Sequence, residues 1–207
     1  MGTVVLMAAS IPAVAWAYSV ARYDYDAAIR SKPNLEHGAE LFRTCAACHG
    51  PDGAGTDDGG VPRIGGQHFR VLAKQLVDYR HAKRWDIRME RITDRHFLVD
   101  PQGIADVAAY VSQLEWPARP DASRAQPSEP GAAIYGARCQ SCHGPIGEGS
   151  NRETVPRLAG QRYEYLVRQI YDAVDGRRPN LSRSHVRLLA HLDRDEILDV
   201  ADFLSRS

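Results

Sequence analysis

Apolar side chains recur at helical spacing in two matching stretches of the chain. Leu72, Leu76 and Tyr79 follow this spacing and predict a helix over residues 68–83. The corresponding stretch, residues 162–174, predicts a second helix of the same kind. No part of the chain shows a convincing alternation of apolar and polar residues, which is the pattern of a half-buried strand. We therefore predict an all-α fold.

Each of these two helices has a predicted helix before it and another after it. The earlier helices are predicted to begin near Glu36 and Gly131. Asp100 followed by Pro101 marks the start of a later helix, because Asp is a good cap and Pro suits the first helical position. Asp193 marks the matching start near the end of the chain. Each half therefore predicts a unit of three helices joined by loops.

The two units are a tandem repeat. Val-Pro-Arg-Ile-Gly-Gly-Gln at residues 61–67 matches Val-Pro-Arg-Leu-Ala-Gly-Gln at residues 155–161, an offset of 94 residues. Such self-similarity indicates duplication of a whole structural unit. We place the first domain at residues 36–116 and the second at residues 131–207. Residues 117–130 between them hold four prolines among small polar residues and predict an extended linker.

The amino-terminal segment has a different character. No charged residue occurs from Thr3 to Ala21, and most positions are apolar. This length can just span a bilayer, while Ala-Trp-Ala before Tyr18 resembles the cleavage site of a secretory signal. Residues 1–21 are therefore expected to be a helical signal peptide or membrane anchor, with a buried core helix as the alternative. Residues 22–35 are interpreted as a connecting segment.

One pentad, Cys-x-x-Cys-His, occurs once in each unit. Its spacing is that of a c-type haem attachment site, in which two thiols bind the porphyrin vinyl groups and the His becomes the proximal iron ligand. The sequence thus predicts two covalently bound haem c groups. The residues concerned are Cys45, Cys48 and His49 in the first unit, and Cys139, Cys142 and His143 in the second. These are all four cysteines of the chain, so no disulfide and no spare nucleophilic thiol is expected.

The charge balance excludes one class of function. The chain carries 26 Lys and Arg against 26 Asp and Glu. Nucleic-acid binding requires a basic footprint, and none is visible. We therefore expect no nucleic-acid partner.

Both units resemble class I cytochrome c domains, and their arrangement resembles the di-haem family typified by cytochrome c4. The resemblance covers about residues 36–207, through the pentads, the Pro-Arg-x-x-Gly-Gln loops and the terminal helix. It implies that Pro62 and Pro156 lie against the proximal histidines and supply a backbone acceptor for the imidazole. It also suggests that Arg63 and Arg157 meet haem propionates, with a solvated surface Arg as the alternative.

The resemblance further implies a distal Met in the loop before the last helix, about eight residues before its cap. The second unit contains no Met, because the three in the chain are Met1, Met7 and Met89. His185 stands eight residues before Asp193. We therefore predict His185 as the distal ligand of the second haem, with a five-coordinate iron as the alternative.

The first unit fits the expected spacing less well. Met89 lies eleven residues before Asp100, and His96 lies four before it. An insertion in the loop would reconcile Met89, which we predict as the ligand, with His96 as the alternative. Since Met/His ligation raises the potential of a haem, the second haem is predicted to have the lower potential. Electrons would then pass from the second haem to the first.

The function that this resemblance implies is that of an electron carrier, with no catalytic residue. Its partners would be a redox protein donor and acceptor, such as a quinol-oxidising complex, a dehydrogenase or a terminal oxidase. The protein would work on the periplasmic side of a bacterial membrane, anchored or released. The alternatives are an electron-transfer subunit of a larger membrane oxidoreductase complex and a di-haem enzyme of the thiosulfate dehydrogenase or peroxidase type.

Overall fold

The computed structural model describes residues 13–116 and 129–207, with side chains from residue 20 onward. Within these residues the chain forms ten helices and no strand, apart from an isolated bridge between Ser150 and Val155. The all-α prediction is confirmed. The helices are α1 (Ala13–Arg30), α2 (Leu35–His49), α3 (Phe69–Arg80), α4 (Ile87–Thr93), α5 (Pro101–Gln113), α6 (Glu129–Arg138), α7 (Gln140–His143), α8 (Tyr163–Val174), α9 (Arg183–Ala190) and α10 (Arg194–Arg206).

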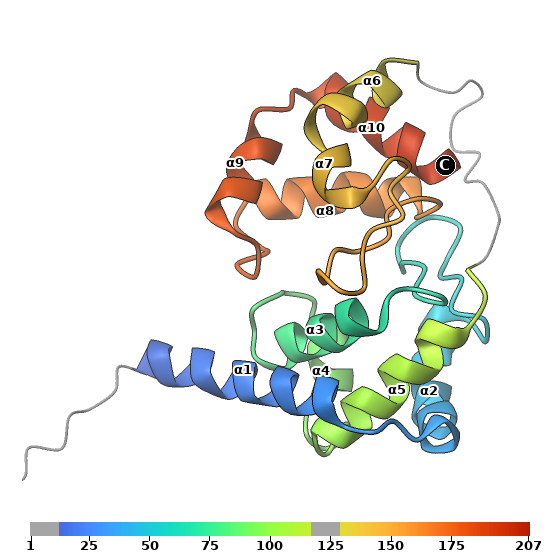
Figure 1. Ribbon diagram of the computed structural model, residues 1–207, viewed down its shortest axis with the longest axis vertical. Helices are drawn as coiled ribbons and strands as arrows, with labels where there is room; N and C mark the ends of the chain where they lie inside the picture. The colour runs from blue at the N-terminus through green and yellow to red at the C-terminus, as the bar shows by residue number, and fades with distance from the viewer. Residues whose placement is uncertain (1–12, 117–128) are drawn as a thin grey trace, which may run out of the picture.

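The helices form two bodies, one above the other in Figure 1. Helices α1 to α5 make the lower body, which we call the first domain. Helices α6 to α10 make the upper body, the second domain. Helices α3 and α8 lie nearest to the boundary between them (Figure 1). The predicted linker lies largely in residues 117–128, outside the described part of the chain.

In each domain the helix that leads into the pentad crosses the last helix at a glycine. In the first domain a Cβ on Gly38 of α2 would lie 2.2 Å from the carbonyl oxygen of Asp106 in α5. In the second domain a Cβ on Gly131 of α6 would lie 2.1 Å from the carbonyl oxygen of Asp199 in α10. Any larger residue would force the helices apart. The two domains therefore share the same backbone contact between these two helices.

The predicted helix starts agree closely with the structure. Asp100 caps α5 and accepts a hydrogen bond from the backbone of Gly103, with Pro101 at the first helical position. Asp193 caps α10 and forms a reciprocal capping box with Glu196. Such caps typically contribute about 1 kcal/mol each. These caps fix where α5 and α10 begin, and therefore where the preceding segment, which holds the candidate distal ligand, ends.

Two short helices, α4 and α9, were not predicted. The sequence placed Met89 and His185 in loops, but the structure places Met89 in α4 and His185 in α9. Each helix has its own cap: Asp86 accepts from the backbone of Met89 at 3.4 Å, and Ser182 accepts from the backbone of His185 at 3.2 Å. A helix of about two turns has too few residues to show a helical period. We call α4 and α9 the distal helices.

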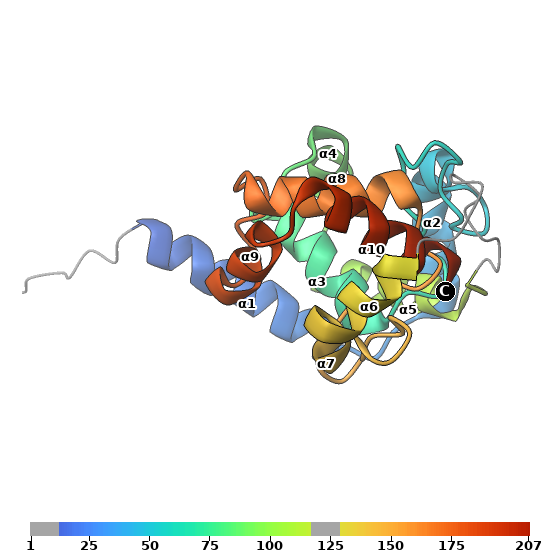
Figure 2. The same ribbon diagram turned by 90° about the horizontal axis from the view of Figure 1, so that it is seen from above.

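The segment expected to connect the amino terminus to the first domain is a packed helix. Helix α1 lies along α3 and α5 and extends beyond the rest of the molecule (Figure 2). Its Ala28 is buried in the core of the first domain. Its Asp24 is also buried, 2.9 Å from Nε2 of His81 and 3.0 Å from the guanidinium of Arg95. The prediction of a mere connection over residues 22–35 was incomplete for this reason.

The apolar segment predicted as a signal peptide or anchor falls mostly outside the described residues, which begin at residue 13. In the part of the chain that the structure describes, no helix combines the length and the apolar character needed to cross a bilayer.

The two domains meet through a reciprocal pair of glutamines. Gln67 of the first domain donates to the carbonyl of Arg157 and accepts from its N–H, both at 2.9 Å. Gln161 of the second domain makes the same two bonds with the backbone of Arg63, again at 2.9 Å. Gln67 and Gln161 are 94 residues apart, as are Arg63 and Arg157. The interface therefore has an internal two-fold character.

A second pair of contacts obeys the same symmetry. Nε2 of His68 donates to the carbonyl oxygen of Glu148 at 2.9 Å. The guanidinium of Arg162 donates to the carbonyl oxygen of Ala54 at 3.2 Å. These residues are again related by the 94-residue offset. The duplicated loops thus bind one another through side chains of one domain and backbone groups of the other, so these bonds depend on the four side chains and on the conformation of the loops.

Candidate haem sites

The first pentad lies at the carboxyl end of α2. Cys45 and Cys48 are free thiols one helical turn apart, the first half-buried and the second exposed. Burial raises the pKa of the Cys45 thiol to about 11. His49 is the last residue of the helix and is buried. Its Nδ1 lies 3.0 Å from the carbonyl oxygen of Pro62.

The second pentad repeats this geometry on the short helix α7. Cys139 is half-buried and Cys142 exposed, and both are free thiols. Nδ1 of His143 lies 3.3 Å from the carbonyl oxygen of Pro156. A carbonyl can only accept, so Nδ1 of each pentad His carries the proton and Nε2 remains free as a metal ligand. Pro62 and Pro156 therefore lie where the resemblance implies.

His185 faces His143 across a gap. The centres of their rings are 6.2 Å apart and the rings are tilted by 44°. Metal–imidazole bonds are about 2.0 Å long, so two imidazoles on one metal ion have ring centres roughly 6 Å apart. Burial, followed by the positive charge of Arg178, lowers the pKa of His185. A neutral imidazole is the form that binds a metal, and the separation of the two rings is compatible with one iron shared between them.

The first site has a different distal side. Asp86 and Arg88, at the start of α4, lie close enough to His49 to influence its pKa, which burial lowers overall. Met89 follows them in α4 and is half-buried. The side chain of His96 is 94% exposed and lies 3.8 Å from Asp94. The structure thus brings the start of Met89's helix, and not His96, toward the pentad.

Arg63 and Arg157 both lie at the boundary between the domains. The guanidinium of Arg63 is buried and donates to the carbonyl oxygen of Gly160 in the second domain. The guanidinium of Arg157 stacks over the ring of Trp116, 5.3 Å from its centre. Through these contacts both arginines link the two domains. Their predicted role at haem propionates stays a prediction.

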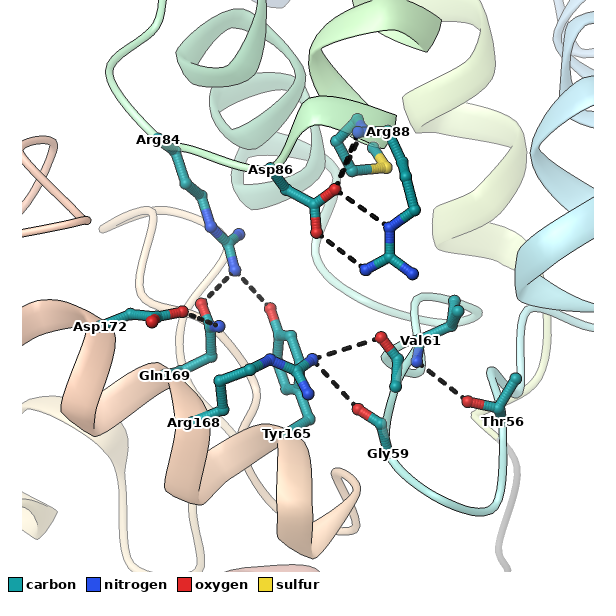
Figure 3. A network of polar contacts seen from close by, with 12 residues as sticks. Thr56, Gly59, Val61, Arg84, Asp86, Arg88, Tyr165, Arg168, Gln169 and Asp172 are labelled. Atoms are coloured by element: carbon teal, nitrogen blue, oxygen red, sulfur yellow. Dashed lines mark hydrogen bonds and ion pairs between the residues drawn. The ribbon is translucent and has the colours of Figure 1, made fainter.

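Arg84 is an interface residue that the sequence analysis missed. It is buried, and Figure 3 shows its guanidinium pointing from the first domain toward Tyr165 and Gln169 of α8. It donates to the hydroxyl of Tyr165 and to the side-chain oxygen of Gln75, both at 2.5 Å, and to Gln169. It also lies over the ring of Tyr79. One signal was available: Arg84 and Gln75 recur 94 residues later as Arg178 and Gln169.

The residues present fit two haem groups of the c type. Each domain holds a pair of free thiols at the required spacing and a His, buried in the first domain and half-buried in the second, whose Nε2 is left unprotonated. The core of each domain is small, which suits a protein whose interior is completed by a prosthetic group. The fold and the sites together define a class: all-α proteins that carry one covalent haem in each of two similar domains.

Comparison with known proteins gives the family. The family model described as Cytochrome c matches residues 35–115 and, a second time, residues 128–207. Cytochrome c4 of Azotobacter vinelandii is 29% identical over 181 residues, which cover 77% of this chain and 82% of the relative. The thiosulfate dehydrogenase electron acceptor of Stutzerimonas stutzeri is 32% identical over 174 residues, covering 78% and 77%.

A solved structure agrees with these relatives. Cytochrome c4 of Acidithiobacillus ferrooxidans superimposes with a TM-score of 0.68 at 28% identity, over 80% of this chain and 99% of that one. The chain belongs to the cytochrome c family and is a di-haem, cytochrome c4-like electron-transfer protein with two covalently bound haem c groups. The predicted family, cofactors and electron-carrier function are confirmed.

Proposed function

We propose that Cys45 and Cys48 hold the first haem by thioether bonds, and that Cys139 and Cys142 hold the second. His49 and His143 are the proximal ligands. The observation that supports this assignment is the hydrogen bond from Nδ1 of each His to a proline carbonyl. This bond fixes the tautomer, orients the ring and makes Nε2 more basic. Haem iron supplies one-electron redox chemistry when bound.

The two distal ligands differ in this proposal. His185 binds the second iron, supported by the 6.2 Å between its ring and that of His143. Met89 binds the first iron, supported by its position in α4 and by the exposure of His96 to solvent. Thioether sulfur favours ferrous iron relative to imidazole and so raises the potential. The first haem therefore has the higher potential, and electrons pass from the second domain to the first.

The interface serves this transfer by holding the domains in one orientation. Gln67 and Gln161 bind the backbone of the loops that follow each pentad. Those same loops supply the proline carbonyls that orient the proximal histidines. Since the contacts are to backbone groups, movement of one domain would disturb the proximal side of the other. The separation of the two irons is thereby kept constant.

The partners in this proposal are redox proteins that donate electrons to one domain and accept them from the other. The apolar segment at residues 1–21 exports the chain, so the exchange occurs on the periplasmic side of the membrane. A second candidate is an electron-transfer subunit that accepts electrons from a dehydrogenase in a larger complex. The relative that is a thiosulfate dehydrogenase electron acceptor favours this candidate over a di-haem enzyme.

Mass spectrometry of the denatured protein tests the haem assignment. The mass should exceed that of the polypeptide by two haem groups, and extraction with acid and acetone should leave both attached. Peptide mapping should place one haem on the peptide with Cys45 and Cys48, and the other on the peptide with Cys139 and Cys142. Loss of colour into the organic phase would contradict the assignment.

A further inference from the structure

A groove of about 620 Å³ lies between the carboxyl end of α8 and the outer side of α9. Apolar and basic side chains line it together, and no Asp or Glu is among the described residues that do so. The residues on which the argument rests are the apolar Val174, Leu181 and Val186 and the basic Arg178, Arg183 and Arg187.

The basic side chains of the groove are only partly neutralised by the residues that the structure describes. Arg183 and Arg187 are exposed, and neither forms an ion pair among those residues. Arg178 differs from them, because its Nε is buried without a hydrogen-bond partner in the same part of the chain and its charge interacts with that of Asp78. Neighbouring Arg177 lies outside the groove lining and pairs with Asp175 at 2.6 Å. The groove therefore offers two exposed cations, Arg183 and Arg187, that have no ion-pair partner among the described residues.

Helix α9 lies between this groove and the second haem site. Successive helical residues are turned by about 100°, so Arg183 and Arg187 lie on the face opposite His185. His185 faces the pentad histidine His143 on the inner side. A helix is about 10 Å thick. A molecule bound in the groove is thus separated from the second haem by a single helix.

The matching helix of the first domain has a different outer surface. Trp85 and Ile87, at the start of α4, are 56% and 64% exposed. Arg88 is neutralised by Asp86 at 2.9 Å. The arginine-lined groove is therefore a feature of the second domain, and the duplication of the domains does not explain it.

We propose that this groove is the docking surface for a redox protein that presents an acidic surface with an apolar centre and exchanges electrons with the second haem. The proposal rests on the proposed function of the second haem. Complementary charge orients an approaching partner and accelerates its association. The apolar lining residues then allow close contact once water is expelled, as at the centre of other protein interfaces.

The test measures electron transfer from the hydroquinone of flavodoxin, an acidic flavin protein, to the holoprotein in a stopped-flow instrument. We expect Arg183→Glu with Arg187→Glu to lower the second-order rate constant by at least about tenfold at low ionic strength. The difference should shrink as salt is added, because salt screens exposed charges. Arg183→Gln with Arg187→Gln should have a smaller effect in the same direction. This variant replaces the Glu variant in the test if the Glu variant does not fold.

The matched control is Arg43→Glu with Arg91→Glu, which makes the same change of net charge at exposed positions of the first domain. We expect it to change the rate by less than about twofold. Equal losses in both double variants, or no loss in the α9 variant, would overturn the proposal. So would loss of binding to vesicles of anionic phospholipid with an unchanged flavodoxin rate, which would identify the groove as a membrane surface.

A second reductant separates this proposal from the function on which it rests. Hexaammineruthenium(II) is a small cation, so a basic groove does not attract it. It should reduce the second haem of the α9 variant as fast as that of the native protein, or faster. If the spectrum shows that His185 is not an iron ligand, the proposed ligation fails, while the comparison of the two double variants still decides the docking surface.

Discussion

The proximal sides of the two domains are nearly the same, whereas their distal helices differ. In both domains the pentad His donates to a proline carbonyl, and a glutamine 18 residues further on binds the other domain. Yet α4 carries Met89 beside the exposed Trp85 and Ile87, and α9 carries His185 behind an arginine-lined groove. Two copies of one domain have thus kept the haem attachment and the interface while changing the distal ligand and the surface beside it.

This difference separates two tasks within each domain. The loop that follows each pentad must border the haem, orient the proximal His through its proline carbonyl and bind the opposite domain. Few substitutions are compatible with all three requirements. The distal helix packs on one neighbouring helix of its own domain, α4 on α3 and α9 on α8, and its outer residues meet solvent. Those outer residues can therefore change, and partner choice with them, at little cost to the fold.

The largest expected effect comes from removing one attachment site. Cys139→Ala with Cys142→Ala should leave a protein with one haem and an unfolded second domain, because the cofactor completes so small a core. The denatured mass should fall by one haem, and circular dichroism should lose much of the helix signal of residues 131–207. Cys45→Ala with Cys48→Ala is the matched control and should unfold the first domain. A fully folded protein after either change would show that the domain does not need its haem.

The distal ligands provide the next test of the difference between the domains. His185→Met should raise the lower of the two potentials and leave the other nearly unchanged, because sulfur favours ferrous iron relative to imidazole. His185→Gly should make the second haem high-spin and open it to small external ligands. Redox titration and absorption spectra measure both effects. If His96→Gly rather than Met89→Gly changes the first haem, the assignment in α4 is wrong.

A smaller effect is expected at the interface that the domains share. Arg84→Met removes the donor to Tyr165, Gln75 and Gln169. Hydrogen bonds to a charged group contribute about 1.5–3 kcal/mol each, so losing three of them should lower the free energy of unfolding by at least about 4.5 kcal/mol. Calorimetry should show the two domains unfolding separately. Arg152→Met, at a side chain that is 92% exposed, is the control and should change stability by less than about 0.5 kcal/mol.

The smallest effect concerns the charge beside the second haem. Arg178 lies close enough to His185 to help lower its pKa. A nearby cation disfavours ferric iron, which carries more positive charge than ferrous iron. Arg178→Gln should therefore lower the potential of the second haem, by less than the 59 mV or so of a tenfold change in the equilibrium. An equal shift at both haems in a redox titration would show that the charge does not act locally.

The sequence predicted the parts of the fold that leave a periodic or repeated pattern. The helices α3 and α8, the caps Asp100 and Asp193, and the duplication itself were all recognisable. Helix α1 was missed as a packed element although Ala21, Tyr25, Ala28 and Ile29 face the core at helical spacing, because small alanines and the buried Asp24 weaken the apolar pattern. The distal helices α4 and α9 were missed because two turns are too short for a period.

The candidate sites follow the same division. The proximal residues could be predicted because one short motif contains both thiols and the His. His185 could be predicted only through the absence of Met from the second domain. Arg84 and the glutamines of the interface could not, because their partners are backbone groups or residues far away in the chain. The hints of their role were recurrences at the repeat offset, of Gln67 as Gln161 and of Arg84 as Arg178.

The most direct measurement is the near-infrared magnetic circular dichroism of the oxidised native protein, which reports the distal ligand of each low-spin haem. We predict two bands of similar weight, one typical of Met/His ligation and one of ligation by two histidines. Met89→His should convert the first band into the second. A single low-spin signal beside a high-spin haem that binds carbon monoxide avidly when reduced would contradict the proposal, since His185 would then not be bound to iron.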